Sequence, residues 1–193
     1  MSTLAALLAD LQSGNAARTE PAAAALPAHG EAGLAALTAL LRHSDPETRW
    51  WAVRSLAGFL HPEAGELLTA ALADSDGGVQ QCAALALSQR PHAGAVPALV
   101  SMLASQDSLL ARLAGDALVA HGAAAVEPLA AALQDSQAQS ARVEAARALA
   151  LIGDTRAIPA LFALLDSDSA LLEHWASEGL QKMGVGMSFF KPG

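Results

Sequence analysis

The sequence predicts an all-α fold, an α-α superhelix or α-solenoid of about six helical hairpins. Two observations carry this prediction. Ala and Leu, which favour helices, dominate a chain of 193 residues that is 53% apolar, 4% aromatic and free of Tyr. Residues of the same kind also recur every 31 positions, as expected for an array of short helical hairpins. The composition argues against an all-β fold.

Four ladders of residues share this spacing and define the repeat. Five positions carry Ala, five carry Leu, three carry Pro and three carry Gly. The members are Ala52, Ala83, Ala114, Ala145 and Ala176; Leu56, Leu87, Leu118, Leu149 and Leu180; Pro97, Pro128 and Pro159; and Gly122, Gly153 and Gly184. Because four independent ladders share one period, the units are copies of one supersecondary structure.

Each unit divides into a first helix, here the A helix, and a second, the B helix. In the unit starting at Ser136, the A helix has an apolar stripe with the 3.6-residue period of a buried face: Ala141, Ala145, Ala148, Leu149 and Ile152. Gly153 suits the left-handed backbone that ends many helices. Asp154 or Thr155 can cap the B helix. That helix has Pro159 in its first turn and buries Ile158, Leu161, Leu164 and Leu165.

The whole chain, 1–193, is predicted to be one domain. Residues 1–43 form a degenerate N-terminal cap and first hairpin: an unpaired B-type helix over 3–12, then helices over 20–26 and 33–41, the first weakened by Pro21 and Pro27. Residues 44–184 are the regular repeats, with turn and capping residues at 44–46, 74–76, 106–108 and 166–169. The last A helix, within 169–184, has no B helix after it, and 185–193 is a tail.

The repeats carry a recognisable consensus. One A helix reads Asp45-Pro-Glu-Thr-Arg-Trp-Trp-Ala-Val-Arg-Ser-Leu56, and another reads Ser140-Ala-Arg-Val-Glu-Ala-Ala-Arg-Ala-Leu-Ala-Leu-Ile-Gly153, followed by Ala-Ile-Pro-Ala-Leu-x-x-Leu-Leu at 157–165. These segments resemble the short HEAT-like repeat associated with phycobilisome lyases. The resemblance covers at least 44–184 and implies an α-solenoid. It leaves function open, because HEAT-like arrays include binding scaffolds, assembly factors and some enzymes.

Charge and cysteine content narrow the classes of partner. With 11 Lys and Arg against 19 Asp and Glu, the net charge is −8, which argues against nucleic acid and anionic membranes as partners. Acidic residues, Arg or Pro interrupt every apolar run before the ~18 residues of a membrane span. The N-terminal segment lacks the basic region of a signal peptide. The single cysteine, Cys82, has no partner for a disulfide or a zinc site. These features predict a cytoplasmic protein.

Three enzyme classes with HEAT-like repeats provide tests of activity. Iron hydroxylases of the deoxyhypusine type use repeated His-Glu dyads, but this chain has only the reversed pair Glu173-His174. HEAT-like DNA glycosylases use a cationic face that a chain with this net charge does not supply. Bilin lyases are similar in size and repeat, although no residue here marks a bilin pocket. We therefore expect no enzymatic activity and no cofactor, and keep a bilin lyase-like accessory role as the alternative.

Residues with reactive side chains are interpreted as structural. His61 and His92 lie 31 positions apart but lack a third metal ligand, so we expect no metal site. His121 occupies a core-facing position of an A helix and should be partly buried, bonded to a backbone carbonyl. Cys82 has no basic neighbour in sequence and should be inert. Gly77 and Gly78 open a helix without the lysine of a phosphate-binding loop.

The candidate binding residues are apolar or small side chains where the repeat expects solvent. HEAT-like arrays place their B helices on the concave face, where one ladder reads Thr38, Thr69, Val100, Ala131 and Phe162, and its neighbour reads Ala39, Ala70, Ser101, Ala132 and Ala163. An uncharged apolar groove on an acidic protein indicates a protein-binding surface. Ala at these sites is also explained by helix preference alone. We expect Phe162 to be the anchor.

Two further apolar features could contact a protein partner. Trp50 and Trp51 point about 100° apart on one helix, so they cannot share one core, and Trp50 is a candidate contact on the outer edge. The tail contains Phe189 and Phe190, which could cap the open end of the array or dock a partner or a second protomer. A protein scaffold or assembly factor, with a possible homo-oligomer through groove or tail, is the function that the sequence favours.

Overall fold

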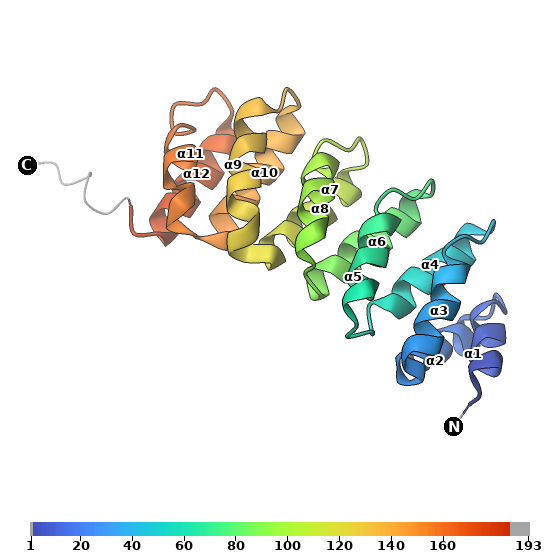
Figure 1. The fold of residues 1–193 in the computed structure, drawn as a ribbon. Coiled ribbons are helices and arrows are strands. Elements are labelled where there is room, and N and C mark those ends of the chain that lie inside the picture. The colour runs from blue at the N-terminus through green and yellow to red at the C-terminus, as the bar shows by residue number, and fades with distance from the viewer. Residues whose placement is uncertain (1, 186–193) are drawn as a thin grey trace, which may run out of the picture. The chain divides into compact units, whose positions relative to one another are not determined.

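The computed structural model describes residues 2–185, which form helices, turns and loops with no β-strand among them. The chain falls into two compact units, Met1–Ala95 and Val96–Gly193. Each unit is a row of short helices packed side by side (Figure 1). This is the α-solenoid fold that the repeat predicts. The prediction of a single domain stays a prediction.

Unit 1 contains six α-helices and two 3₁₀ turns among its described residues. In chain order they are α1 (Leu4–Leu11), α2 (Ala16–Ala25), η1 (Leu26–His29), α3 (Gly30–Leu40), α4 (Pro46–Leu56), α5 (Pro62–Ala71), α6 (Gly77–Gln89) and η2 (Ala93–Ala95). The two prolines expected to weaken the first hairpin act differently. Pro21 lies inside α2, whereas Pro27 lies in η1, where the chain turns towards α3.

Unit 2 repeats the same alternation. Its elements are α7 (Val96–Met102), α8 (Ser108–His121), η3 (Gly122–Ala125), α9 (Val126–Asp135), α10 (Gln139–Ile152), η4 (Thr155–Ala157), α11 (Ile158–Phe162) and α12 (Ala170–Lys182). The A helices α4, α6, α8, α10 and α12 begin at residues 46, 77, 108, 139 and 170. The 31-residue period of the sequence is therefore the period of the A-helix starts.

The helices pair in a different order from the expected units, in which an A helix is followed by its own B helix. Each B helix makes its more extensive contacts with the A helix that follows it, as α3 does with α4, α5 with α6, and α9 with α10. The N-terminal helix α1 packs on α2, and the last A helix α12 packs on α11. The expectation that residues 3–12 form an unpaired helix is therefore wrong. Pairing each B helix with its successor gives six hairpins, α1–α2 to α11–α12, among the described residues.

The register of helix α9 departs from the 31-residue ladder. Buried Ala95, Val96 and Leu99 of one hairpin correspond to buried Ala125, Val126 and Leu129 of the next, which lie only 30 positions later. The 31-residue ladder had placed Ala130 at the position of Leu99. Burial of the apolar residues decides the helix phase here, so the surface position equivalent to Val100 is Ala130 and not the expected Ala131.

Helix ends follow the capping residues expected from the sequence. Asp45, Asp76 and Asp107 cap α4, α6 and α8 by accepting hydrogen bonds from backbone N–H groups of the first turn. Gly153 ends α10 in the left-handed conformation, with φ of 68°. Because only glycine adopts this backbone without steric cost, the glycine ladder marks the ends of A helices.

The core of each unit consists of Leu, Ala and Val from the facing stripes of A and B helices. Ala52, Leu56, Leu87, Leu118 and Leu149 from the ladders are fully buried. The predicted B-helix stripe of α11 is partly confirmed: Leu161 and Leu164 are buried, and Ile158 and Leu165 are half-buried. Helix α11 itself is short and ends at Phe162.

One described segment, Ser108–Asp135, has the length and apolar composition that a membrane-spanning helix needs. It consists of α8, η3 and α9, and its direction changes at Gly122, whose φ is 56°. Both α-helices pack on α10, and their apolar stripes are buried in that contact. A helix that is buried in a protein core passes the same composition test, so the segment is weak evidence for a membrane span.

Candidate binding surfaces

The B-helix ladder of candidate residues lies off the core stripe in both units. In unit 1, Thr38 and Thr69 are half-buried, and their hydroxyls donate hydrogen bonds to carbonyls of their own helices, Leu34 at 2.9 Å and Gly65 at 2.8 Å. Because the hydroxyls are engaged by the helix, the two threonines add little hydrogen-bonding capacity to this surface.

A shallow hollow separates two B helices of unit 1. It has a volume of about 250 Å³ and lies between α3 and α5. Its lining combines predicted ladder residues with others: Thr38, Leu41, Arg42, Leu67, Ala70, Ala71 and Asp74. Two of the predicted groove residues, Thr38 and Ala70, therefore line one hollow, which also contains charged side chains that the ladder did not include.

Phe162 is the one large side chain of the predicted ladder that is exposed among the described residues of unit 2. Its exposed fraction is 56%, whereas the adjacent Leu161 is fully buried. Val100 is half-buried on α7, Ala130 is half-buried on α9, and Ala163 beyond α11 is exposed. The side chain of Phe162 is thus exposed at the end of α11, as the helix phase predicted.

The tryptophan pair takes an arrangement that the sequence left open. Trp50 and Trp51 are both half-buried, and their rings meet edge to face with centroids 4.8 Å apart. The backbone carbonyl of Trp50 lies 4.0 Å from the Sγ atom of Cys82 on α6. The ring of Trp50 lies near the start of α6, since its Cδ1 atom is 4.0 Å from the place of a Cβ at Gly78. Its role as a partner contact stays a prediction. The two tail candidates, Phe189 and Phe190, lie outside the described residues.

Two reactive side chains are placed as expected. His121 is half-buried, and its Nδ1 atom lies 2.7 Å from the carbonyl oxygen of Ala117, one turn earlier in α8. Cys82 is buried, and burial raises the pKa of its thiol to about 12. Because the thiolate is the reactive form, Cys82 is a poor nucleophile at neutral pH.

Unit 2 contains a buried charged cluster that was not predicted from the sequence. The guanidinium of Arg147 on α10 is 1% exposed and pairs with Glu144 at 2.7 Å and with Asp116 on α8 at 2.8 Å. Gly115 provides the space, since a Cβ there would lie 2.6 Å from the Arg147 Nη2 atom. A glycine facing an arginine one repeat later is the signal that could have revealed this cluster.

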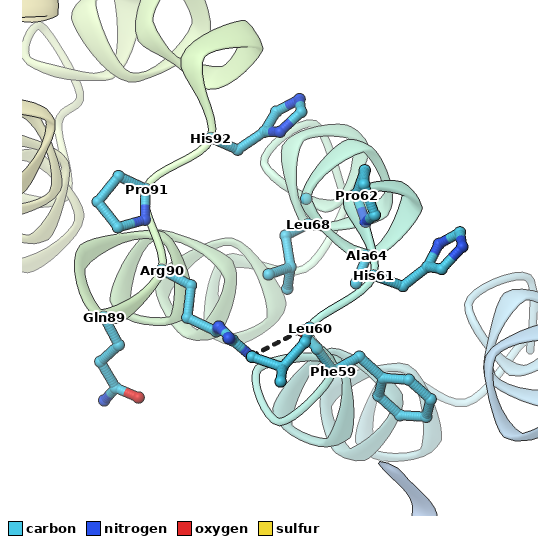
Figure 2. A pocket seen from close by; sticks show the side chains of 11 residues that line it. Phe59, Leu60, His61, Pro62, Ala64, Leu68, Gln89, Arg90, Pro91 and His92 are labelled. Atoms are coloured by element: carbon cyan, nitrogen blue, oxygen red, sulfur yellow. Dashed lines mark hydrogen bonds between the residues drawn. The ribbon is translucent and has the colours of Figure 1, made fainter. Parts of the chain in front are cut away.

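Unit 1 contains a pocket that was not predicted from the sequence either (Figure 2). The pocket has a volume of about 350 Å³ and lies beside the loops that follow α4 and α6. Its lining residues are Phe59, Leu60, His61, Pro62, Ala64, Gly65, Leu68, Gln89, Arg90, Pro91 and His92. Both loop histidines border it. His61 also caps α5, because its Nδ1 atom accepts a hydrogen bond from the N–H of Glu63 at 3.3 Å.

A metal site at these two histidines would need further ligands close to them. Among the described residues, no group of three or more His, Cys, Asp or Glu side chains lies close enough together to hold a metal ion. The loops do bring Arg90 to the pocket, where its Nη1 atom donates to the carbonyl of Phe59 at 2.7 Å. The pocket is therefore a polar recess with one permanent cation.

Comparison with protein families shows what the repeat is. Residues 34–119 and 126–185 match HEAT repeats. The chain belongs to the HEAT-repeat family. The matched residues include every regular repeat, and they begin upstream of the predicted start at residue 44 because α3 belongs to the first regular hairpin.

Solved structures share the α-solenoid fold of this chain. An engineered protein is 26% identical, with 95% of this chain and 97% of that chain covered and a TM-score of 0.55. A chain from the complex of CpcE and CpcF of phycocyanin lyase from Nostoc sp. PCC7120 is 24% identical, with 95% and 78% covered and a TM-score of 0.57. A designed armadillo repeat protein in complex with the peptide (KR)4 is 20% identical, with 94% and 100% covered and a TM-score of 0.54. A search of curated proteins finds no match.

Proposed function

We propose that this HEAT-repeat protein is a non-enzymatic cytoplasmic scaffold or assembly factor that binds a protein partner on its B-helix surface, with Phe162 as anchor. The observation that carries the proposal is that Phe162 is 56% exposed at the end of α11, whereas the preceding residue, Leu161, is fully buried. An exposed aromatic side chain among small neighbours is a common form of interaction hot spot. The repeat fold supports the same role, because HEAT-type arrays present extended surfaces for partners.

The chemistry of the side chains supports a role in binding over a role in catalysis. The Cys82 thiol is buried with a raised pKa, and the Nδ1 atom of His121 faces a carbonyl of its own helix. Neither group is placed to act on a substrate. The net charge of −8 supports a protein partner over nucleic acid or an anionic membrane.

The test is capture of the partner from the native host with wild-type protein and with two matched variants. Phe162→Ala should weaken partner binding about thirtyfold, equivalent to ~2 kcal/mol, and leave the melting temperature nearly unchanged. Leu171→Ala on α12 is the control, because Leu171 is 58% exposed in the same unit. Equal binding by all three proteins would contradict the proposal, and so would loss of binding only with Leu171→Ala.

The second candidate is an accessory factor or subunit of a bilin lyase-like complex that acts on a tetrapyrrole-bearing protein. The resemblance of the repeat to phycobilisome lyase repeats favours it, and the fold of the CpcE–CpcF chain agrees. Addition of a bilin should then induce visible absorbance and raise the melting temperature. A scaffold without this role should show neither change, so the two candidates give opposite results in one titration.

A further inference from the structure

The pocket in unit 1 lies where one position of the repeat is changed. The B helices carry a buried leucine in their core stripe, and three residues before it four of them have an aliphatic side chain: Leu34, Val96, Val126 and Ile158. In α5 this position is Gly65. A Cβ at Gly65 would lie 2.6 Å from the Nδ1 atom of His92, so the imidazole occupies volume that the aliphatic side chain fills elsewhere.

This change is costly for the helix and specific to one hairpin. Glycine inside a helix destabilises it relative to alanine, and the lost aliphatic group removes core contacts. A second glycine, Gly94, completes the slot, since a Cβ there would lie 3.0 Å from the Nε2 atom of His92. A residue that departs from the repeat pattern and lowers stability is expected at a functional site of a protein.

A second change places a cation in the same pocket. Residues at the end of the A helices that correspond to Arg90 include the apolar Phe59, Ile152 and Met183. The Nη1 atom of Arg90 donates to the carbonyls of Phe59 at 2.7 Å and Ala57 at 3.4 Å. Within residues 2–185, the Nε and Nη2 atoms of Arg90 have no hydrogen-bond partner. These bonds orient the guanidinium and leave one two-donor edge for a ligand.

The other lining residues indicate which chemical group could lie next to an anion bound at Arg90. No lining residue of the pocket is acidic, although the protein as a whole carries a net charge of −8. Leu60 is 86% exposed at the rim, and the exposed Pro62 and Pro91 add apolar surface (Figure 2). The pocket thus combines a cationic centre with apolar side chains at its edge.

We propose that this pocket binds a carboxylate that is carried next to an aliphatic side chain. The Nε–Nη2 edge of Arg90 matches the two oxygens of a carboxylate, with two parallel hydrogen bonds. Leu60 and the two prolines contact the aliphatic group. The carboxylate can come from the C-terminus of a polypeptide or from an acidic side chain within one, and the same recognition applies to both.

The probes that test the proposal are small and defined. Full-length protein is titrated with N-acetyl-L-leucine, with the peptide acetyl-Leu-Glu-Leu-amide, with N-acetyl-L-leucinamide and with inorganic phosphate, while NMR follows the Nε–H of Arg90 and the amides of Gly65 and Gly94. One or both carboxylates should give saturable shifts, and the stronger of the two identifies the source. The uncharged amide should bind about tenfold or more weakly. Absence of saturation with both carboxylates, or equal affinity for phosphate, would overturn the proposal.

Two variants separate binding from folding. The double variant Gly65→Leu with His92→Ala restores the aliphatic core residue and retains Arg90. It should keep or raise the melting temperature and weaken carboxylate binding about tenfold or more.

Arg90→Met removes the cation and should weaken binding similarly, whereas Arg54→Met, at an exposed arginine of the same unit, should leave binding unchanged. If either the double variant or Arg90→Met fails to fold, the other still tests whether the pocket binds the carboxylate. Wild-type affinity in a folded variant of the pocket would overturn the proposal.

Discussion

Arg147 shows how a single residue depends on its neighbours in adjacent helices. Its guanidinium is buried between α8 and α10 and is matched by Glu144 and Asp116. A charge in such a place is tolerated only when paired and hydrogen-bonded. Gly115 has a structural role as the residue that leaves room for this pair.

We predict that Gly115→Ala lowers the free energy of unfolding by about 1–3 kcal/mol, because the added Cβ displaces the Arg147 ion pairs. This loss should exceed the gain of ~1 kcal/mol expected from replacing glycine by alanine in a helix. Gly77→Ala is the control, since a Cβ at Gly77 meets no atom within 4 Å. Urea unfolding of the three proteins measures the difference. A Gly115→Ala variant as stable as Gly77→Ala would show that the cluster shifts freely.

Aspartates that cap helices or pair with arginine predict the response to acid. Hydrogen bonds from Arg49 hold the pKa of Asp74 below its ordinary value, and those from Thr48 do the same for Asp45. Hydrogen bonds from Arg156 lower the pKa of Asp154 to about 2. In the unfolded chain these groups have ordinary aspartate pKa values near 4.

The stability that these carboxylates contribute is fully present above about pH 4 and is lost as the pH falls through their lower folded-state pKa values. We therefore expect the melting temperature to fall as the pH is lowered from 5 towards 2. Asp74→Asn should reduce the stability at pH 5 and flatten this fall, because the variant has no carboxylate to protonate. An equal slope for wild type and variant would contradict the role of the Arg49–Asp74 pair.

At the scale of elements, the A helices begin at the same position of each repeat, but only some of them have a capping side chain. Asp45, Asp76 and Asp107 bond to the first turns of α4, α6 and α8. The equivalent residues of α10 and α12 are Ala138 and Ser169, and neither makes a side-chain capping bond. The first turn of α10 therefore has backbone N–H groups that no capping side chain satisfies.

We predict that Ala138→Asp raises the free energy of unfolding by about 1 kcal/mol, because the extended backbone at Ala138 suits a capping residue. The reverse change, Asp107→Ala on α8, should lower it by about 1 kcal/mol. Chemical denaturation of both variants checks the pair. A loss of stability with Ala138→Asp would mean that residues near 138 need the present backbone for another contact.

At the scale of the whole molecule, stability is expected to be distributed along the array. Contacts in each unit connect helices that are near neighbours in sequence, so one helix stabilises the next and has little direct effect on distant ones. Among the described residues, the first and last helices have neighbours on one side only. They should therefore open at lower free energy than central helices.

Leu118 and Leu11 test this expectation, because both are almost fully buried, one in α8 and the other in the terminal helix α1. Leu118→Ala should cost about 2–5 kcal/mol of global stability. Leu11→Ala should lower hydrogen-exchange protection in α1 and α2 and leave protection in α10 unchanged. Loss of protection in α10 with Leu11→Ala would show that the chain unfolds as one cooperative unit.

The sequence by itself determined the repeat, the helix starts and the helix ends. Residues such as Asp45, Asp107 and Gly153 act on backbone groups within a few positions, so their effect can be predicted from spacing alone. The exposure of Phe162 followed from the same logic, because its phase relative to Leu161 is a local property of the helix.

Tertiary structure decided which helices pair, how α9 is rotated and where the pockets lie. The one-residue shift at α9 minimises exposed apolar surface, which depends on neighbouring helices and not on the repeat length. Gly115 with Arg147, and Gly65 with His92, are each more than 25 positions apart. The structural role of a glycine in one helix depends on the side chain that occupies the space beside it. Only packing between repeats brings that side chain and the glycine together.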